Sequence, residues 1–208
     1  MWPALRRKIR YVATARAKRA AVLVPGGGSA DGPLLAYAGQ AVQRRGGYAH
    51  RLAWTGRERV SWPAWPSAAP VFSPEIHAWV VSQVSAAIDE TAAASGVPAP
   101  VVIGKSLGSL AAPLVADRDL AAVWFTPLPT DDATVKALRR ATAPFLLIGG
   151  TADRLWEGPV ARSLSPHVIE VEAADHGMFV PGELSASAAV LGQVMTAVEL
   201  FLDQVIWP

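Results

Sequence analysis

Short apolar runs alternate along the chain with longer stretches whose composition favours helices. The runs are almost uninterrupted by polar residues, which is typical of strands buried on both faces of a parallel sheet. The candidate strands are residues 20–25, 48–54, 100–103, 121–125, 145–148 and 167–171, with 9–14 as an additional edge strand. The candidate helices are residues 32–46, 74–95, 107–116, 131–140, 155–164 and 184–205. This alternation predicts an α/β fold: a doubly wound, mostly parallel sheet of about six or seven strands with helices on both faces.

Proline and glycine support several of these boundaries. Pro33 stands in the first turn of its candidate helix, where a missing N–H costs nothing. Gly96 directly follows the helix 74–95, as a helix-ending glycine commonly does. Pro113 lies inside the candidate helix 107–116, so it must kink that helix or end it early.

The size of the chain favours one domain. It has 208 residues, of which 51% are hydrophobic and 17% charged. This length allows one sizeable core and is short for two ordinary domains. We find no internal repeat or linker, and no long insertion separates the strands 121–125 and 145–148. We therefore expect a single domain at 20–208 without a lid domain.

Positive charge is concentrated at the start of the chain. Residues 1–19 carry seven arginines and lysines and no acid, whereas the net charge of the whole chain is +2. Such a segment suits contact with a nucleic acid or a membrane surface, or else a solvated edge strand with a loose terminus. We favour the edge strand and expect no nucleic-acid partner, because no aromatic stacking platform accompanies the charge. The segment lacks the apolar run of a signal peptide, and no run resembles a membrane span of about 20 residues, which predicts a cytoplasmic protein.

Residues 104–108, GKSLG, match the pattern G-x-S-x-G. The apolar run VVI leads directly into them and a candidate helix follows, which is the context of a nucleophile elbow. Small residues on both sides of Ser106 suit the strained turn, and the N–H of Leu107 is then directed at a developing oxyanion. We therefore predict that Ser106 is a nucleophile. Lys105 has two open interpretations: it assists an anionic substrate, or it has a structural role.

Two nucleotide-binding motifs are excluded. The residues GKS would belong to a phosphate-binding loop only with glycine at position 99, which is Ala99. The glycines 26–28 do not complete G-x-G-x-x-G, because position 31 is Asp31. The absence of cysteine excludes disulfides, thiolate metal sites and a cysteine nucleophile. We expect no cofactor and no metal.

A serine hydroxyl is a weak nucleophile, so it needs a base. After an elbow the expected chain order is serine, acid, histidine, and only His167 and His176 follow Ser106. His167 begins a candidate strand and suits an exposed edge position. His176 lies in the loop after that strand, where the sites of open α/β sheets gather. We therefore predict that His176 is the general base.

The base needs an orienting acid. Asp153 follows the candidate strand 145–148, at the same sheet edge as the serine and the histidine. Asp131 and Asp132 lie one strand earlier and suit the capping of a helix. Asp175 adjoins the histidine in sequence, but adjacent side chains usually diverge. We therefore predict that Asp153 is the acid.

The loop PGGGS after the first candidate strand is the expected source of a second oxyanion donor, because glycine lets a backbone N–H approach a ligand closely. We assign that role to Gly27 and place Gly28 in the substrate pocket. The other pocket candidates are Trp54, Trp62, Trp65, Trp156 and Met178. The tryptophans equally suit a structural role, in which they pack a proline-rich loop onto the sheet.

These motifs resemble the α/β-hydrolase superfamily across nearly the whole chain. The details resemble the small lidless hydrolases related to dienelactone hydrolase, and also the Tex30/KANSL3-like branch. The segments that carry this resemblance are PGGGS, GKSLGS, GGTADRLW and ADHGMF. The resemblance implies triad roles for Ser106, Asp153 and His176, and oxyanion roles for Leu107 and Gly27. Two positions depart from many relatives: Arg154 stands where they carry proline, and Lys105 is common in the second branch only.

We therefore expect a serine hydrolase that cleaves a small carboxylic ester, lactone or thioester through an acyl-enzyme formed on Ser106. Its expected partner is a small-molecule acyl substrate, and the sequence makes no prediction of oligomeric state. Two alternatives stay open, because the fold also hosts other functions. One is a catalytically silent binding or scaffold protein, and the other is a non-hydrolytic biosynthetic enzyme that uses the same site.

Overall fold

The computed structural model describes residues 18–62 and 72–208. The candidate edge strand 9–14 and Trp65, a residue of the loop rich in tryptophan, lie outside the described residues. Six parallel strands form one sheet in the order β2–β1–β3–β4–β5–β6. The strands are β1 (Ala20–Val24), β2 (Tyr48–Arg51), β3 (Val101–Lys105), β4 (Ala122–Phe125), β5 (Phe145–Gly150) and β6 (Val168–Val171).

The strand order reverses next to β1, which pairs with β2 on one side and with β3 on the other. Val22 of β1 is opposite His50 of β2 and Val102 of β3. Ligands of open α/β sheets bind in the crevice beyond the carboxyl ends of the strands at such a reversal. The loops that follow β1 and β3 meet there, so the topology places residues 25–29 and 104–108 where a ligand is expected to bind.

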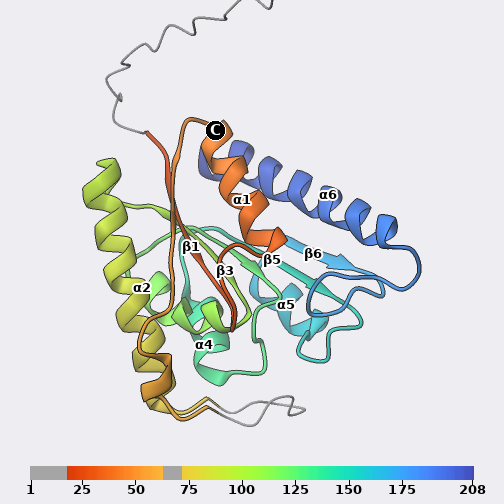
Figure 1. Ribbon diagram of the computed structural model, residues 1–208, viewed down its shortest axis with the longest axis horizontal. Helices are drawn as coiled ribbons and strands as arrows, with labels where there is room; N and C mark the ends of the chain where they lie inside the picture. The colour runs from red at the N-terminus through yellow and green to blue at the C-terminus, as the bar shows by residue number, and fades with distance from the viewer. Residues whose placement is uncertain (1–17, 63–71) are drawn as a thin grey trace, which may run out of the picture.

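Helices cover both faces of the sheet (Figure 1). On one face lie α1 (Pro33–Arg44) and α6 (Leu184–Phe201), which run side by side. On the other lie α2 (Pro74–Ser95), α3 (Ala112–Asp117), α4 (Asp132–Arg140) and α5 (Gly158–Leu164). The predicted doubly wound sheet with helices on both faces is confirmed.

The core is split into two layers because successive side chains of a strand point to opposite faces. In β1, Val22 and Val24 pack against the α2 side, whereas Ala21 and Leu23 pack against α1 and α6. Every residue of β1 is buried. This explains the uninterrupted apolar runs in the sequence, since a strand covered on both faces has no solvent-facing side.

The helix α2 begins and ends where the sequence predicts. Ser73 caps its N-terminus by accepting a hydrogen bond from the N–H of Ile76, and Pro74 occupies the first helical position. Gly96 ends the helix with a φ of 76°, a conformation that favours glycine.

The predicted helix 107–116 is wrong as one continuous element. Residues Ser106–Ala111 form a 3₁₀ helix, η2, and α3 begins only at Ala112. Pro113 lies in the first turn of α3, where its missing N–H has no intrahelical acceptor to lose. Proline therefore starts a new helix here, rather than kinking an existing one.

One helix among the described residues has the length and hydropathy of a membrane span. It covers Leu184–Ile206, which is α6 with the π-helical turn η3 (Leu202–Ile206), and its mean hydropathy is 1.5. The expectation that no run has this composition is therefore wrong for this segment. In the structure the helix packs along the sheet, with Val194, Val198 and Leu202 fully buried. This contact accounts for part of its apolar character, as in the core helix of a globular domain.

Candidate active site

Ser106 stands where β3 ends and η2 begins, at the reversal of the strand order. Its φ is 49°, in the left-handed region, which costs a non-glycine residue on the order of 1–3 kcal/mol. The flanking glycines leave room for this turn. A Cβ at Gly104 would lie 2.4 Å from the Trp124 ring, and one at Gly108 would lie 2.9 Å from the Val24 carbonyl oxygen. The strained strand–turn–helix that the motif predicts is present.

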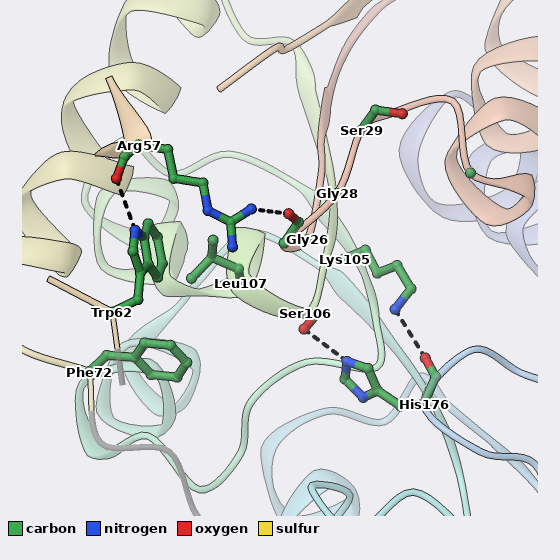
Figure 2. A pocket seen from close by; sticks show the side chains of 12 residues that line it. Gly26, Gly28, Ser29, Arg57, Trp62, Phe72, Lys105, Ser106, Leu107 and His176 are labelled. Carbon is green, nitrogen blue, oxygen red and sulfur yellow. Dashed lines mark hydrogen bonds between the residues drawn. The ribbon is translucent and has the colours of Figure 1, made fainter. Parts of the chain in front are cut away.

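Ser106 is the first member of a continuous hydrogen-bonded chain. Its Oγ lies 2.8 Å from Nε2 of His176, and Nδ1 of His176 lies 2.7 Å from Oδ2 of Asp153. Figure 2 shows the imidazole directed at the serine hydroxyl. Asp153 is only 5% exposed, so its carboxylate is shielded from water. The structure brings together the three residues that the sequence singled out, from three different strand ends.

Asp153 follows β5 and is held in a tight turn. Its N–H donates to the carbonyl of Gly150, and its Oδ1 accepts a hydrogen bond from the N–H of Leu155. One carboxylate oxygen thus anchors the side chain, and the other faces His176. This arrangement fixes the direction of the carboxylate before any ligand binds.

The loop that carries His176 has its own internal support. Asp175 accepts hydrogen bonds from the N–H groups of Gly177 and Phe179 at 2.8 and 2.9 Å. Met178 has a φ of 65°, which turns the chain sharply after the histidine. Asp175 therefore shapes the loop and is not the partner of the imidazole.

Lys105 ties this loop to the sheet. Its ammonium donates to the carbonyl oxygen of His176 at 3.0 Å (Figure 2). It also donates to Oγ1 of Thr126 at 3.2 Å. Burial lowers the pKa of Lys105, while the charges of Asp153 and Asp175 oppose that shift. The sequence leaves the structural role of Lys105 open, because no sequence pattern shows that the end of β3 contacts the loop that carries His176.

The rival acids and histidines have other partners. Asp131 caps α4 by accepting from the N–H of Thr134 at 2.8 Å, and it also contacts Nε2 of His77 at 3.1 Å. Asp132 lies inside the first turn of α4. His167 packs edge-on against Phe201, with 5.1 Å between the ring centroids. None of these three contacts includes Ser106.

Two side chains hold the glycine loop after β1. The indole N–H of Trp54 donates to the carbonyl oxygen of Gly26 at 2.8 Å. The guanidinium of Arg57 donates to the carbonyl oxygen of Gly27. Figure 2 shows the Arg57 side chain directed at the loop that carries Gly26 and Gly28. In a trans peptide the C=O and the next N–H point in opposite directions. Trp54 therefore fixes the direction of the Gly27 N–H, and Arg57 fixes that of the Gly28 N–H.

Trp54 and Arg57 both contact a cluster of tryptophan rings. Trp54 lies against Trp79 of α2, with centroids 4.8 Å apart, and Trp62 meets Trp79 edge-on at 5.4 Å. The Arg57 guanidinium lies over the Trp62 ring, 4.7 Å from its centroid. The backbone carbonyl oxygen of Arg57 also accepts a hydrogen bond from the indole N–H of Trp62. The tryptophan cluster thus supports the glycine loop from the α2 side, which answers the open structural alternative for Trp54.

A cavity of about 630 Å³ opens above the serine. Its walls include Ser106 and His176, and also Leu107, Gly27 and Gly28 from the predicted set. The remaining side chains in its walls are those of Ser29, Arg57, Trp62, Phe72 and Lys105. Of these, the sequence indicated Trp62 as a pocket candidate and left the role of Lys105 open, but it missed Ser29, Arg57 and Phe72. No motif marks Arg57 or Phe72, because they enter the cavity from a short 3₁₀ helix and from a loop without regular secondary structure.

Three predicted pocket residues lie elsewhere. Trp54 does not line this cavity but stands behind the glycine loop. Trp156 is buried against Gly149 and donates its indole N–H to Glu170 at 2.7 Å. Met178 lines a neighbouring cavity of about 410 Å³. In the part of the chain that the structure describes, no group of three or more acidic or histidine side chains is arranged to hold a metal ion.

Solved structures of hydrolases superpose on almost the whole chain. Est1E from Butyrivibrio proteoclasticus with bound ferulic acid has a TM-score of 0.69 and 12% identity, covering 93% of this chain and 92% of its own. Dienelactone hydrolase from Anabaena variabilis has a TM-score of 0.61 and 21% identity, covering 91% and 88%. A lidless α/β serine hydrolase from Xanthomonas campestris has a TM-score of 0.62 and 13% identity, covering 91% and 83%.

No family model matches the chain, and no curated protein matches it significantly. The structural similarity nevertheless establishes the fold. The chain has the α/β-hydrolase fold, in a form whose described residues include no separate lid domain. The resemblance noted in the sequence motifs is confirmed at this level.

Proposed function

We propose that the chain is a serine hydrolase that cleaves a small carboxylic ester, lactone or thioester through an acyl-enzyme on Ser106. The observation that carries the proposal is the hydrogen-bonded chain from Ser106 through His176 to Asp153 at a strained elbow. Nucleophile, base and orienting acid with this mutual geometry define the catalytic triad of acyl transfer on several unrelated folds.

The proposed reaction has two halves. In the first, Nε2 of His176 takes the proton of Ser106 while Oγ attacks the carbonyl carbon. The tetrahedral intermediate collapses, the bond to the leaving oxygen or sulfur breaks, and His176 returns the proton to the leaving group. In the second, His176 takes a proton from water as the water attacks the acyl-enzyme. Collapse releases the carboxylic acid, and the proton goes back to Ser106.

Asp153 has an orienting role in this scheme. Its carboxylate accepts a hydrogen bond from Nδ1–H of His176, so the neutral imidazole presents an unprotonated Nε2 to the serine. It also stabilises the imidazolium that forms in each half-reaction. In catalytic triads of this kind the orienting acid does not itself take up the proton.

The backbone N–H groups of Leu107 and Gly27 are the proposed oxyanion donors. Leu107 follows the serine in the first turn of η2, where an N–H has no helical acceptor. Gly27 lines the cavity opposite, and the Trp54 hydrogen bond to the Gly26 carbonyl sets the direction of its N–H. Donors that are held in place before the reaction stabilise a developing oxyanion most effectively, since they need no reorganisation.

Covalent labelling tests the proposal. We expect the purified protein to react with a fluorophosphonate probe and to hydrolyse short p-nitrophenyl esters. The Ser106→Ala variant is expected to lose both activities and to keep the circular dichroism spectrum of the wild type. Labelling that persists in the folded variant would exclude Ser106 as the nucleophile. A wild-type protein that neither labels nor hydrolyses any ester, lactone or thioester would favour the binding or scaffold alternative.

A further inference from the structure

A second cavity lies beside the one above the serine. Its volume is about 410 Å³, within the usual range for small-molecule sites. It is enclosed by the start of α1, the loop after His176 and the first turns of α6. Its large apolar side chains are those of Leu34, Leu35, Met178, Phe179, Leu184 and Leu191.

The polar side chains in its wall are engaged elsewhere. The Lys105 ammonium donates to the carbonyl of His176 and to Thr126. The Ser187 hydroxyl is bonded to the backbone of Val180, both as acceptor and as donor. Ser29 is bonded to Asp31. A ligand in this cavity would therefore meet apolar surface, and a polar ligand would lose its hydration without replacement.

The rim of the cavity exposes apolar side chains to water. Phe179 is 52% exposed and Leu184 is 73% exposed, and both belong to its wall. Exposed apolar side chains that gather around a concave site mark binding surfaces more often than isolated ones do. Their burial by a ligand would remove this area from water, which is favourable.

The two cavities are neighbours, since Ser29, Gly32 and Lys105 line both. Figure 2 shows Lys105 beside Ser106, with its side chain extending toward His176. A molecule whose carbonyl carbon lies at the serine Oγ can thus extend past Lys105 into the second cavity. We propose that this cavity binds a neutral, apolar arm of the substrate, an unbranched alkyl chain or an aryl group. The inference rests on the proposed function and narrows its substrate class to esters with such an arm.

Two ester series test the proposal and identify which side of the ester enters. One series lengthens the acyl chain of p-nitrophenyl esters, and the other lengthens the alcohol of alkyl acetates. We expect kcat/KM to rise by two- to fourfold per added methylene in one series, until the cavity is filled. The upper value corresponds to about 0.8 kcal/mol per buried methylene. A flat response in both series would overturn the proposal.

Variants that fill the cavity give the matched comparison. Ala188→Phe and Leu191→Trp enlarge two wall residues from the first turns of α6. Leu200→Trp is the control, because Leu200 lies on the same helix, is 50% exposed and does not line the cavity. The filled variants should keep the circular dichroism spectrum of the wild type and lose the dependence on chain length, whereas Leu200→Trp should keep both. Chain-length dependence that survives in both filled variants would contradict the proposal.

A binding measurement separates this inference from the proposed reaction. The neutral probe N-phenyl-1-naphthylamine should fluoresce with wild type, Ser106→Ala and Leu200→Trp, and only weakly with Ala188→Phe. Should no ester be hydrolysed, this pattern would still support an apolar ligand site and the proposed reaction alone would fail. The proposed apolar ligand site would be overturned if the probe does not bind the wild type, or if it binds all variants equally. A protein dimer that covers Phe179 and Leu184 and excludes the probe would also overturn it.

Discussion

Asp153 divides its two carboxylate oxygens between structure and proposed chemistry. Oδ1 accepts the N–H of Leu155, and Oδ2 faces Nδ1 of His176. Because the first hydrogen bond anchors the side chain, the second can select one imidazole tautomer. The near-complete burial of Asp153 strengthens this selection, since little water competes for the carboxylate.

Replacement of Asp153 by Asn should leave the fold intact and remove this selection. The amide oxygen can still accept the N–H of Leu155, but its NH₂ group would then face Nδ1. The imidazole would carry its proton on Nε2 and fail to accept the Ser106 proton. We expect kcat on an ester to fall by two to four orders of magnitude. The control is Asp131→Asn, which removes the carboxylate at His77 and should keep most of the activity. If Asp131→Asn lost activity and Asp153→Asn kept it, Asp131 at the start of α4 would be the orienting acid.

The hydrogen bond from Trp54 to Gly26 leads to a second prediction at this scale. Trp54→Phe keeps most of the ring contact with Trp79 but removes the indole N–H that holds the Gly26 peptide. The Gly27 N–H would lose its fixed direction, so we expect kcat to fall by about tenfold to a hundredfold with little change in KM. Binding of a trifluoromethyl ketone, which forms the same oxyanion, should weaken in proportion.

A matched variant shows whether the effect belongs to the glycine loop. Trp79→Phe removes an indole hydrogen bond of the same kind in the same cluster, but its acceptor is the carbonyl of Thr55. This variant should lose stability without a comparable loss of kcat. Equal losses of kcat in Trp54→Phe and Trp79→Phe would mean that the cluster acts through general packing.

The candidate site was predictable to the extent that its residues follow apolar strands. Ser106, Asp153 and His176 each lie just beyond a strand end, and the parallel topology brings such positions to one sheet edge. Arg57 was not predicted as part of the site, and the role of Lys105 was left open. Their positions depend on the conformation of a long loop and on a contact between chain segments far apart in sequence. Neither leaves a periodic signal.

At the scale of elements, β3 is longer than its apolar run indicates. The run VVI predicted a strand that ends at residue 103, but the strand continues through Gly104 to Lys105. Both extra residues keep their register, opposite Trp124 and Phe125 of β4. The strand therefore delivers Ser106 directly to the edge, and a 3₁₀ helix rather than an α-helix receives it. Hydrophobic periodicity identifies such elements well and their ends poorly, because local hydrogen bonds decide the ends.

Lys105 at the end of β3 makes stability depend on pH. An unfolded lysine keeps its proton up to its ordinary pKa of 10.5, whereas burial lowers the pKa of Lys105 in the folded chain. Between these two values the unfolded state binds more protons, so the free energy of unfolding contributed by this group rises with pH. Lys105→Met removes the titration. We expect wild type to gain stability relative to the variant as pH rises toward 10.5, measured by urea denaturation at several pH values above neutrality.

The same experiment has a clear contrary outcome. A difference between wild type and Lys105→Met that is constant over this range would mean that the ammonium is as well solvated in the fold as in the unfolded chain. A residue on the surface supplies the control. Lys136 lies exposed on α4, and Lys136→Met should show no such pH-dependent difference.

At the scale of the whole molecule, one ion-pair network joins the start and the end of the described fold. Arg45, which follows α1, donates to both carboxylate oxygens of Asp203 in η3 at 2.6 Å, and to Glu199 of α6 at 3.0 Å. The arginine is largely buried, whereas the two acids are partly exposed. Among the described residues, α1 and α6 form one helical layer (Figure 1). The second cavity lies between their first turns. The network therefore holds together the two helices that enclose the proposed apolar site.

The geometry of this network predicts a modest, pH-dependent contribution to stability. The hydrogen bond from Arg45 lowers the pKa of Asp203 below 3.8. A carboxylate with a lowered pKa stabilises the fold above its unfolded pKa and loses that effect as the pH falls through the folded value. Because Asp203 is 47% exposed and solvent screens it, we expect Asp203→Asn to cost ~1 kcal/mol or less at pH 7.

The decisive comparison is between pH 7 and pH 3, by urea denaturation of both proteins. The difference between wild type and Asp203→Asn should narrow as the pH falls below 3.8, since the carboxylate then becomes neutral, and it should also shrink in 1 M NaCl. Asp117→Asn is the control, because its pair with Arg140 is exposed on both sides and should contribute little at either pH. A difference that stays constant across pH and salt would assign the effect to packing at the end of α6. In that case the bidentate geometry of Arg45 would fix the position of the helix without stabilising the fold.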